Sequence, residues 1–186
     1  MNSYALVPNI IDQSRYKFIS EIFFLICGVF LVSVMAQITI SLPWTPVPIT
    51  GQTFGVTLMA LTWGGSRSFR VLLTYLFIGG MGLPVFAMGK SGLGFGPTLG
   101  YLIGMLISSF VVGSLADRGF IRSFFHSWLA AICGSFVVFT CGLAVLSFFV
   151  PKESLLMAGL IPFLLGDLIK NTLAALMASK IRKAFN

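Results

Sequence analysis

Charged side chains are scarce in this chain. Asp, Glu, Lys and Arg make up only 9% of its 186 residues, and just five residues are acidic. Soluble globular domains carry charge at about 25% of their positions. A chain with so little charge that is 57% apolar cannot cover the surface of a soluble domain with polar groups. The composition therefore predicts a membrane protein whose solvent is lipid.

The residues that usually build catalytic or metal sites are also few. The single histidine, His126, lies near the end of an apolar run, and Cys27, Cys133 and Cys141 lie inside such runs without a CxxC spacing. Isolated cysteines there behave as small hydrophobic residues. The sequence contains neither a GxSxG nor an HExxH motif, which would indicate hydrolytic or zinc chemistry. We expect no metal, no cofactor and no enzymatic activity.

Apolar segments with little charge recur along the chain. A transmembrane helix needs about 20 mainly apolar residues, so a chain of 186 residues leaves no room for a second domain beside six spans. We expect one membrane domain over residues 18–182, a lead at 1–17 and a tail at 183–186. The expected spans are approximately residues 18–39, 51–63, 69–82, 98–115, 124–149 and 155–178. The predicted fold class is an all-α bundle of six transmembrane helices.

Prolines and glycines mark the breaks between these spans. Residues 41–50 (SLPWTPVPIT) hold three prolines, which lack an amide donor and restrict the preceding residue, so no helix passes through them. Residues 83–97 are rich in glycine. Apolar side chains in these two loops, among them Trp44, Phe86 and Phe95, would be exposed without a partner. We expect the two loops to form a lid over a cavity.

The basic residues predict the orientation of the bundle, because Lys and Arg accumulate on the cytoplasmic side of a membrane. With six spans, four basic clusters fall on one side, within 15–17, 67–70, 118–122 and 180–183. Lys90 and Lys152 fall on the other side. Both termini are therefore expected to be cytoplasmic. The net charge of +7 is divided among separate loops, which suits anionic lipid headgroups and not nucleic acid.

Asp167 and Lys170 interrupt the apolar interior of the last predicted span. Ionisable residues at such positions are costly and by default mark a functional site. Because they are three apart, the two side chains share one helix face and can neutralise each other. If the helix begins at Leu155, Asp167 lies about 18 Å along it at 1.5 Å per residue; if Pro162 marks its start, Asp167 lies nearer the outer boundary. A purely structural ion pair is the alternative to a binding site.

Further polar residues could line the same cavity. Gln52 begins the second predicted span, Thr74 and Tyr75 lie in the third, Tyr101 begins the fourth, and Asn171 lies in the last. A hydrogen bond between helices explains each of them equally well.

Four ordered blocks of the sequence resemble the BioY family, the biotin-binding S components of energy-coupling factor (ECF) transporters. Residues 46–54 (PVPITGQTF) are similar to the first-loop signature of that family. Three further blocks follow in the family's order, at 82–87 (GLPVFA), 96–102 (GPTLGYL), and 162–170, which holds Pro162, Phe163, Gly166, Asp167 and Lys170. Together the blocks span most of the chain from residue 36 to residue 170.

The resemblance implies an S-component-like bundle in a bacterial-type inner membrane, with a pocket that opens outward and captures biotin with high affinity. It also implies a partner assembly, the ECF module, made of two ATP-binding subunits and a transmembrane coupling protein. Asp167 would accept from the ureido N–H groups of biotin, and either Lys170 or Lys90 would meet its carboxylate. The expected substrate-binding residues are Asp167, Lys170, Gln52, Tyr101, Lys90, Trp44 and Phe86.

Three alternatives stay open. The same fold would serve an S component for another vitamin. A solitary carrier that works without the ATPase module is also consistent, because Val29 and Ser33 stand where family members often carry small residues four apart on the first helix. A membrane enzyme that uses Asp167 and Lys170 for acid–base chemistry would lack a second catalytic group within reach.

Overall fold

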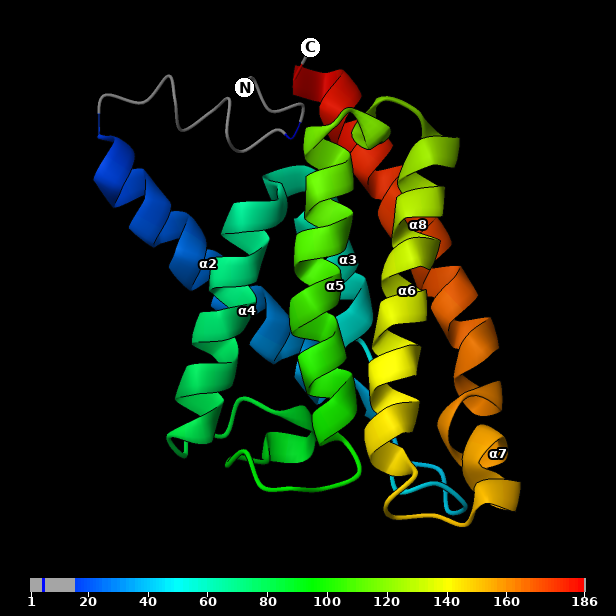
Figure 1. Cartoon of the computed structure of the whole chain (residues 1–186). Helices are drawn as coiled ribbons and strands as arrows, with labels where there is room; N and C mark the ends of the chain where they lie inside the picture. Colours follow the sequence, from blue (N-terminus) through cyan, green and yellow to red (C-terminus); the bar gives the residue numbers. More distant parts are fainter. Residues whose placement is uncertain (1–4, 6–15, 186) are drawn as a thin grey trace.

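The computed structural model describes residue 5 and residues 16–185. Most of the lead predicted at 1–17, including Arg15, lies outside this part of the chain. Within the described residues six long helices form one bundle (Figure 1). Their bounds are α2 Lys17–Gln37, α3 Gln52–Trp63, α4 Gly65–Gly80, α5 Leu99–Asp117, α6 Phe124–Leu146 and α8 Ile161–Phe185.

Among the described residues, four segments are long and apolar enough to cross a membrane: α2, α5, α6 and the segment 152–184, which includes all but the last residue of α8. Helices α3 and α4 have 12 and 16 residues, fewer than the roughly 20 that a typical span needs. The six helices nevertheless occupy the segments in which the sequence predicts spans. The chain is a multi-pass helical membrane protein, while the side on which each terminus lies stays a prediction.

Helix α5 lies at the centre of the bundle and packs against α3, α4 and α6, and α8 packs against α3 and α6. Helix α2 crosses α3 and α4 obliquely at the edge (Figure 1). Gly28 permits this crossing, because a Cβ there would lie only 2.7 Å from the Trp63 ring and 2.8 Å from Val71. The loops before α3, α5 and α7 gather at one end of the bundle (Figure 1, bottom).

Short elements order these loops. The strands β1 (Thr39–Ile40) and β2 (Ile49–Thr50) pair antiparallel and close the proline-rich loop at its base. The all-α prediction did not include this ribbon, because strand pairing depends on residues about ten positions apart and local proline content does not reveal it. The remaining short elements are the 3-10 turns η1 (Ala87–Gly89), η2 (Phe120–Arg122) and η3 (Lys152–Ser154), and helix α7 (Leu155–Gly159).

The last predicted span, 155–178, is not one continuous helix. It is divided into α7 and α8, which begins at Ile161 next to Pro162. Proline has no N–H with which to bond the carbonyl four residues earlier, and the Thr45 hydroxyl donates to that carbonyl, Ala158 O, at 2.5 Å. Pro162 therefore marks the helix start, and Asp167 is the seventh residue of α8.

A close backbone approach lies at the opposite end of the bundle, between α5 and the α3–α4 junction. Gly64 turns the chain with φ of +83°, a conformation that favours glycine. A Cβ on Gly113 of α5 would lie 2.5 Å from backbone atoms of Gly64 and Gly65. Three glycines thus let two layers of the bundle meet backbone to backbone.

We expect Gly113→Ala to lower the thermal unfolding temperature in detergent by several degrees, because overpacking against a backbone costs about 1–3 kcal/mol. Gly166→Ala is the matched control, since a Cβ on Gly166 would have no neighbour within 4 Å and alanine favours the helix by up to about 1 kcal/mol. Equal transitions for the two variants would contradict the close approach of α5.

Candidate functional site

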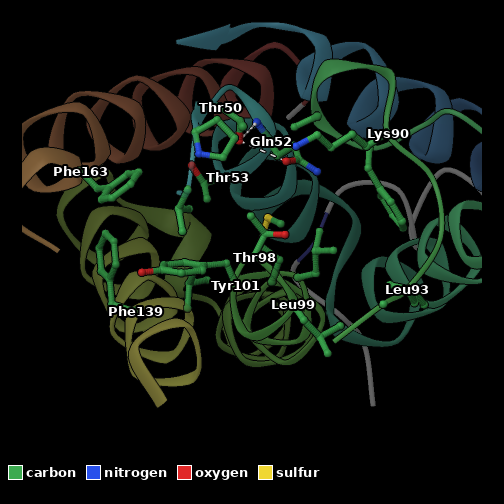
Figure 2. Close-up of a pocket in the computed structure, with 18 of the residues that line it drawn as sticks. Thr50, Gln52, Thr53, Lys90, Leu93, Thr98, Leu99, Tyr101, Phe139 and Phe163 are labelled. Atoms are coloured by element: carbon green, nitrogen blue, oxygen red, sulfur yellow. Dashed lines mark hydrogen bonds between the residues drawn. The ribbon is translucent and has the colours of Figure 1, made fainter. Parts of the chain in front are cut away.

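A cavity of about 180 Å³ opens at the end of the bundle where the loops gather (Figure 2). Its walls come from the residues around β2 and the start of α3, from residues 86–94 of the α4–α5 loop, and from α5, α6 and α8. An engineered apolar cavity of about 150 Å³ holds a benzene ring. The space is therefore large enough for a small ring system.

Lys170 reaches from α8 to the start of α3. Its Nζ donates to the Thr50 carbonyl at 3.2 Å and to the Thr53 hydroxyl at 2.6 Å, and all three residues line the cavity. An ammonium group has three donors. One N–H of Lys170 is left for a ligand.

Asp167 points to the other neighbour of α8. Its Oδ2 accepts from Asn171 Nδ2 at 2.8 Å, and the same nitrogen lies 2.7 Å from Ser135 Oγ on α6. Asp167 and Lys170 are not among the ion pairs within 4.0 Å of the described residues, but they interact electrostatically at longer range, so the mutual neutralisation expected from their spacing does not require direct contact. Three residues rotate an α-helix by about 300°, so the two side chains diverge by about 60° and contact different helices.

Gln52 lines the cavity, but its amide is engaged within the protein. Its Nε2 donates to the Tyr75 hydroxyl at 2.7 Å, and that hydroxyl donates to the Val85 carbonyl at 2.9 Å. The Thr50 hydroxyl donates to Gln52 Oε1 at 3.2 Å. This chain of hydrogen bonds joins α3, α4 and the α4–α5 loop, so Gln52 supports the wall of the cavity.

Tyr101 contributes its ring to the cavity and its hydroxyl to the fold. The hydroxyl donates to Gly159 O at 2.7 Å, a carbonyl without its helical partner because the Phe163 amide bonds Leu160 O instead. In Figure 2 the rings of Tyr101, Phe139 and Phe163 lie on one side of the cavity and Lys90 lies on the opposite side. The cavity has an aromatic side and a cationic side.

The two lid loops differ in what they bring to the cavity. Phe86 is buried and packs edge-to-face on Tyr75 with ring centroids 5.4 Å apart, and Lys90 lines the opening. Trp44 is 63% exposed and Phe95 is 67% exposed, and neither lines the cavity. Beside Trp44 in the first loop, the buried side chain is that of Thr45, whose hydroxyl donates to Ala158 O at the break between α7 and α8.

Several lining residues were not singled out from the sequence, among them Thr53, Phe139 and Phe163. Thr53 lies beside Gln52 in the 46–54 block, so that block carried a signal for it. Phe163 also lies in one of the four blocks. Phe139 lies in the apolar run of α6, where one of many phenylalanines faces the cavity and periodicity alone does not identify it.

The fold and the site define a class: a small helical membrane protein with a small-molecule cavity beneath loops at one end. A solved structure of the S-component for biotin from an ECF-type ABC transporter shares this fold, with a TM-score of 0.83 over 92% of this chain and 95% of that chain, at 24% sequence identity. The S-component fold is thereby established for this chain.

The chain belongs to the BioY family, whose model matches residues 9–186. It is 37% identical over 159 residues to the biotin transporter BioY of Thermotoga maritima, covering 84% of this chain and 93% of that protein. It is 34% identical over 154 residues to the probable biotin transporter BioY of Pyrococcus horikoshii, covering 82% and 90% of the two chains. These relatives are named for transport and not for catalysis.

We expect Tyr101→Phe to lower the unfolding temperature more than it weakens ligand binding. The substitution leaves the buried Gly159 carbonyl without a donor, which costs about 1–3 kcal/mol, while the ring that lines the cavity is kept. Thermal unfolding and equilibrium binding of the purified variant measure the two effects. A large loss of affinity with an unchanged transition would show instead that the hydroxyl serves the ligand.

Proposed function

We propose that this protein captures biotin from the outer side of the membrane and mediates its uptake as the substrate-binding subunit of an ECF-type transporter. The observation that carries the proposal is the arrangement of Asp167, Lys170 and Lys90 around one mainly apolar cavity. Family membership and the names of the relatives support biotin as the substrate.

Biotin matches the chemistry of the cavity. Its ureido ring has two N–H donors and one carbonyl acceptor, its bicycle is apolar, and its side chain ends in a carboxylate. The Asp167 carboxylate has about four acceptor positions, of which Asn171 and Ser135 occupy two. A few placed polar groups in an apolar cavity are typical of small-molecule sites.

The two sides of the cavity suggest how biotin is oriented. In this proposal the bicycle lies among Tyr101, Phe139 and Phe163, with the ureido N–H groups on Asp167 and the ureido oxygen on the remaining N–H of Lys170. The carboxylate then extends to Lys90 at the exposed opening. Lys170 is the less suitable partner for the carboxylate, because it is already held by Thr50 and Thr53.

The cavity end of the bundle is proposed to face outward. Among the described residues, the basic clusters at 67–70, 118–122 and 180–183 lie at the opposite end, whereas Lys90 lines the cavity and Lys152 lies in the loop before α7 at the same end. The positive-inside rule then assigns the cavity to the outer side and both termini to the cytoplasm of a bacterial-type inner membrane.

Transport is proposed to use an ECF module of two ATP-binding subunits and a transmembrane coupling protein. The alternatives are an S component for another vitamin and a solitary biotin carrier. Biotin uptake by cells that lack every other ECF subunit would favour the solitary carrier.

Radiolabelled biotin is expected to bind the purified protein saturably in detergent, displaced by excess biotin but not by thiamine or riboflavin. Asp167→Asn should weaken binding about 10- to 100-fold, because a hydrogen bond to a charged group contributes about 1.5–3 kcal/mol. The asparagine oxygen still accepts from Asn171, so the unfolding temperature should change little.

Asp117→Asn is the matched control, because this carboxylate accepts from the Gly65 amide at the far end of the bundle and should leave the affinity unchanged. A folded wild-type protein that binds no biotin would refute the assignment. Displacement by thiamine or riboflavin instead would favour the other-vitamin alternative.

Lys90→Met should weaken binding of biotin about fivefold, as expected for an exposed ion pair of about 1 kcal/mol, and should leave binding of biotin methyl ester unchanged. Lys152→Met is the control, because Lys152 is an exposed lysine at the same end of the bundle that does not line the cavity. If wild type and Lys90→Met bind biotin with equal affinity, the partner of the biotin carboxylate is Lys170 and not Lys90.

A further inference from the structure

Gln37, the last residue of α2, contacts the lid from outside the cavity. Its Nε2 donates to the Phe86 carbonyl at 3.1 Å, and its Oε1 accepts from the Gly89 amide at 3.0 Å. Both polar atoms of one side chain thus bind the backbone of the η1 turn, about 50 residues further along the chain. Gln37 does not line the cavity.

The η1 turn contains strained backbone, although its own chain closes it with hydrogen bonds from Gly89 N to Phe86 O at 3.1 Å and from Lys90 N to Ala87 O at 3.3 Å. Met88 adopts φ of +62° and Gly89 adopts φ of +66°, and this conformation is unfavourable for a residue with a side chain. A Cβ on Gly82, Gly89 or Gly92 would have no neighbour within 4 Å, so the backbone is loosely packed at these points. Strained turns persist only where surrounding structure holds them.

The same turn presents cavity-lining residues. Phe86 precedes it, Ala87 lies within it and Lys90 follows it, and Phe86 N donates to Lys90 O at 3.0 Å to close the turn. A shift of the turn would move an apolar wall and a cation of the cavity together.

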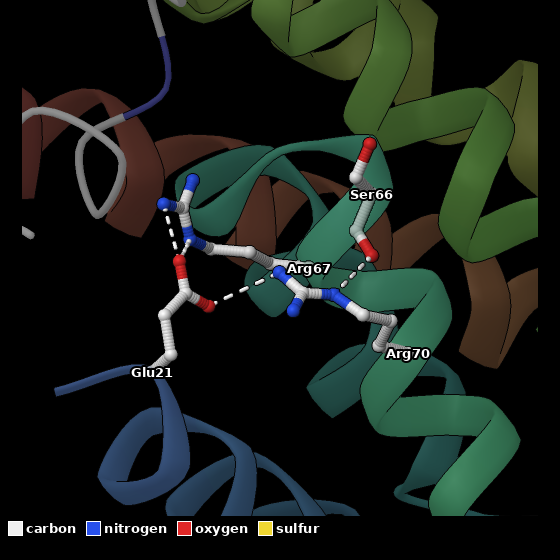
Figure 3. Close-up of polar contacts among 4 residues, drawn as sticks. All are labelled: Glu21, Ser66, Arg67 and Arg70. Atoms are coloured by element: carbon white, nitrogen blue, oxygen red, sulfur yellow. Dashed lines mark hydrogen bonds and ion pairs between the residues drawn. The ribbon is translucent and has the colours of Figure 1, made fainter. Parts of the chain in front are cut away.

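The opposite half of α2 is fixed independently of the lid. Glu21 Oε1 accepts from Arg67 Nη2 at 2.7 Å and from Arg67 Nε at 2.9 Å, and Glu21 Oε2 accepts from Arg70 at 3.0 Å (Figure 3). These contacts hold α2 to α4. They provide a way to disturb α2 without touching the lid.

We infer that Gln37 is a positioning residue that holds the lid turn closed over the substrate cavity. The inference rests on the proposed function for the identity of the substrate, but not for the action of Gln37 on the turn. Loss of its two hydrogen bonds raises the population of open lid, so substrate both enters and leaves faster.

Limited proteolysis of the ligand-free protein in detergent tests the effect on the turn. Trypsin cleaves after Lys90, whose carbonyl must first leave Phe86 N, and cleavage of a transiently opened segment follows the population of its open form. Gln37→Met removes both hydrogen bonds at similar side-chain length. Cleavage at Lys90 should rise about tenfold relative to cleavage at Lys152, the internal reference in another exposed loop of the same end.

Glu21→Gln is the matched control, because it loosens α2 at the end that does not contact the lid. It should leave the Lys90 to Lys152 cleavage ratio unchanged. A Gln37→Met ratio equal to that of wild type, or an equal rise in Glu21→Gln, would overturn the role of Gln37. If cleavage rises at both Lys90 and Lys152, Gln37 contributes only to the general stability of the protein, and this outcome would also overturn the inference.

Binding kinetics test the consequence for the substrate. Gln37→Met should raise the association and dissociation rates of radiolabelled biotin, with a larger increase in the dissociation rate, and bound biotin should protect Lys90 from trypsin in the wild type. Unchanged rates in the variant would overturn the inference. If wild type binds no biotin but the cleavage ratio rises in Gln37→Met, the proposed function fails and the positioning role of Gln37 stands.

Discussion

Inside a bilayer a backbone polar group has no water to bond, so it must find its partner within the protein. The break between α7 and α8 shows how much of this structure depends on that constraint. Pro162 deprives Ala158 O of its helical donor, and the first loop and α5 supply hydroxyls to this carbonyl and the next one. The loop, the central helix and the start of the charged helix are thereby joined at the edge of the cavity.

The same constraint separates the two charges of α8. Lys170 is satisfied by the start of α3 and Asp167 by Asn171 on its own helix. The two side chains therefore bond different parts of the protein, and both residues line the cavity. A direct ion pair would have stabilised helix packing and left a substrate less to bind.

The lid is built from backbone that the rest of the protein holds in place. Tyr75 and Gln37 reach the α4–α5 loop from α4 and α2, and Gln52 reaches it through Tyr75. Phe86 of this loop is buried in the core of the bundle, so the loop is ordered by contacts with the helices around it. The ends of α2 serve different contacts, one to α4 and one to the lid.

The sequence by itself determined the membrane class, the six helical segments and the pair Asp167 and Lys170, because apolar runs, prolines and intramembrane charges are local features with strong physical meaning. The four family-like blocks also included most of the residues that line the cavity. Only the tertiary structure decided that Trp44 lies outside the cavity, that Asp167 and Lys170 diverge, and that Gln37 contacts the lid. Those outcomes depend on which helix lies beside which side chain, and sequence spacing does not contain that information.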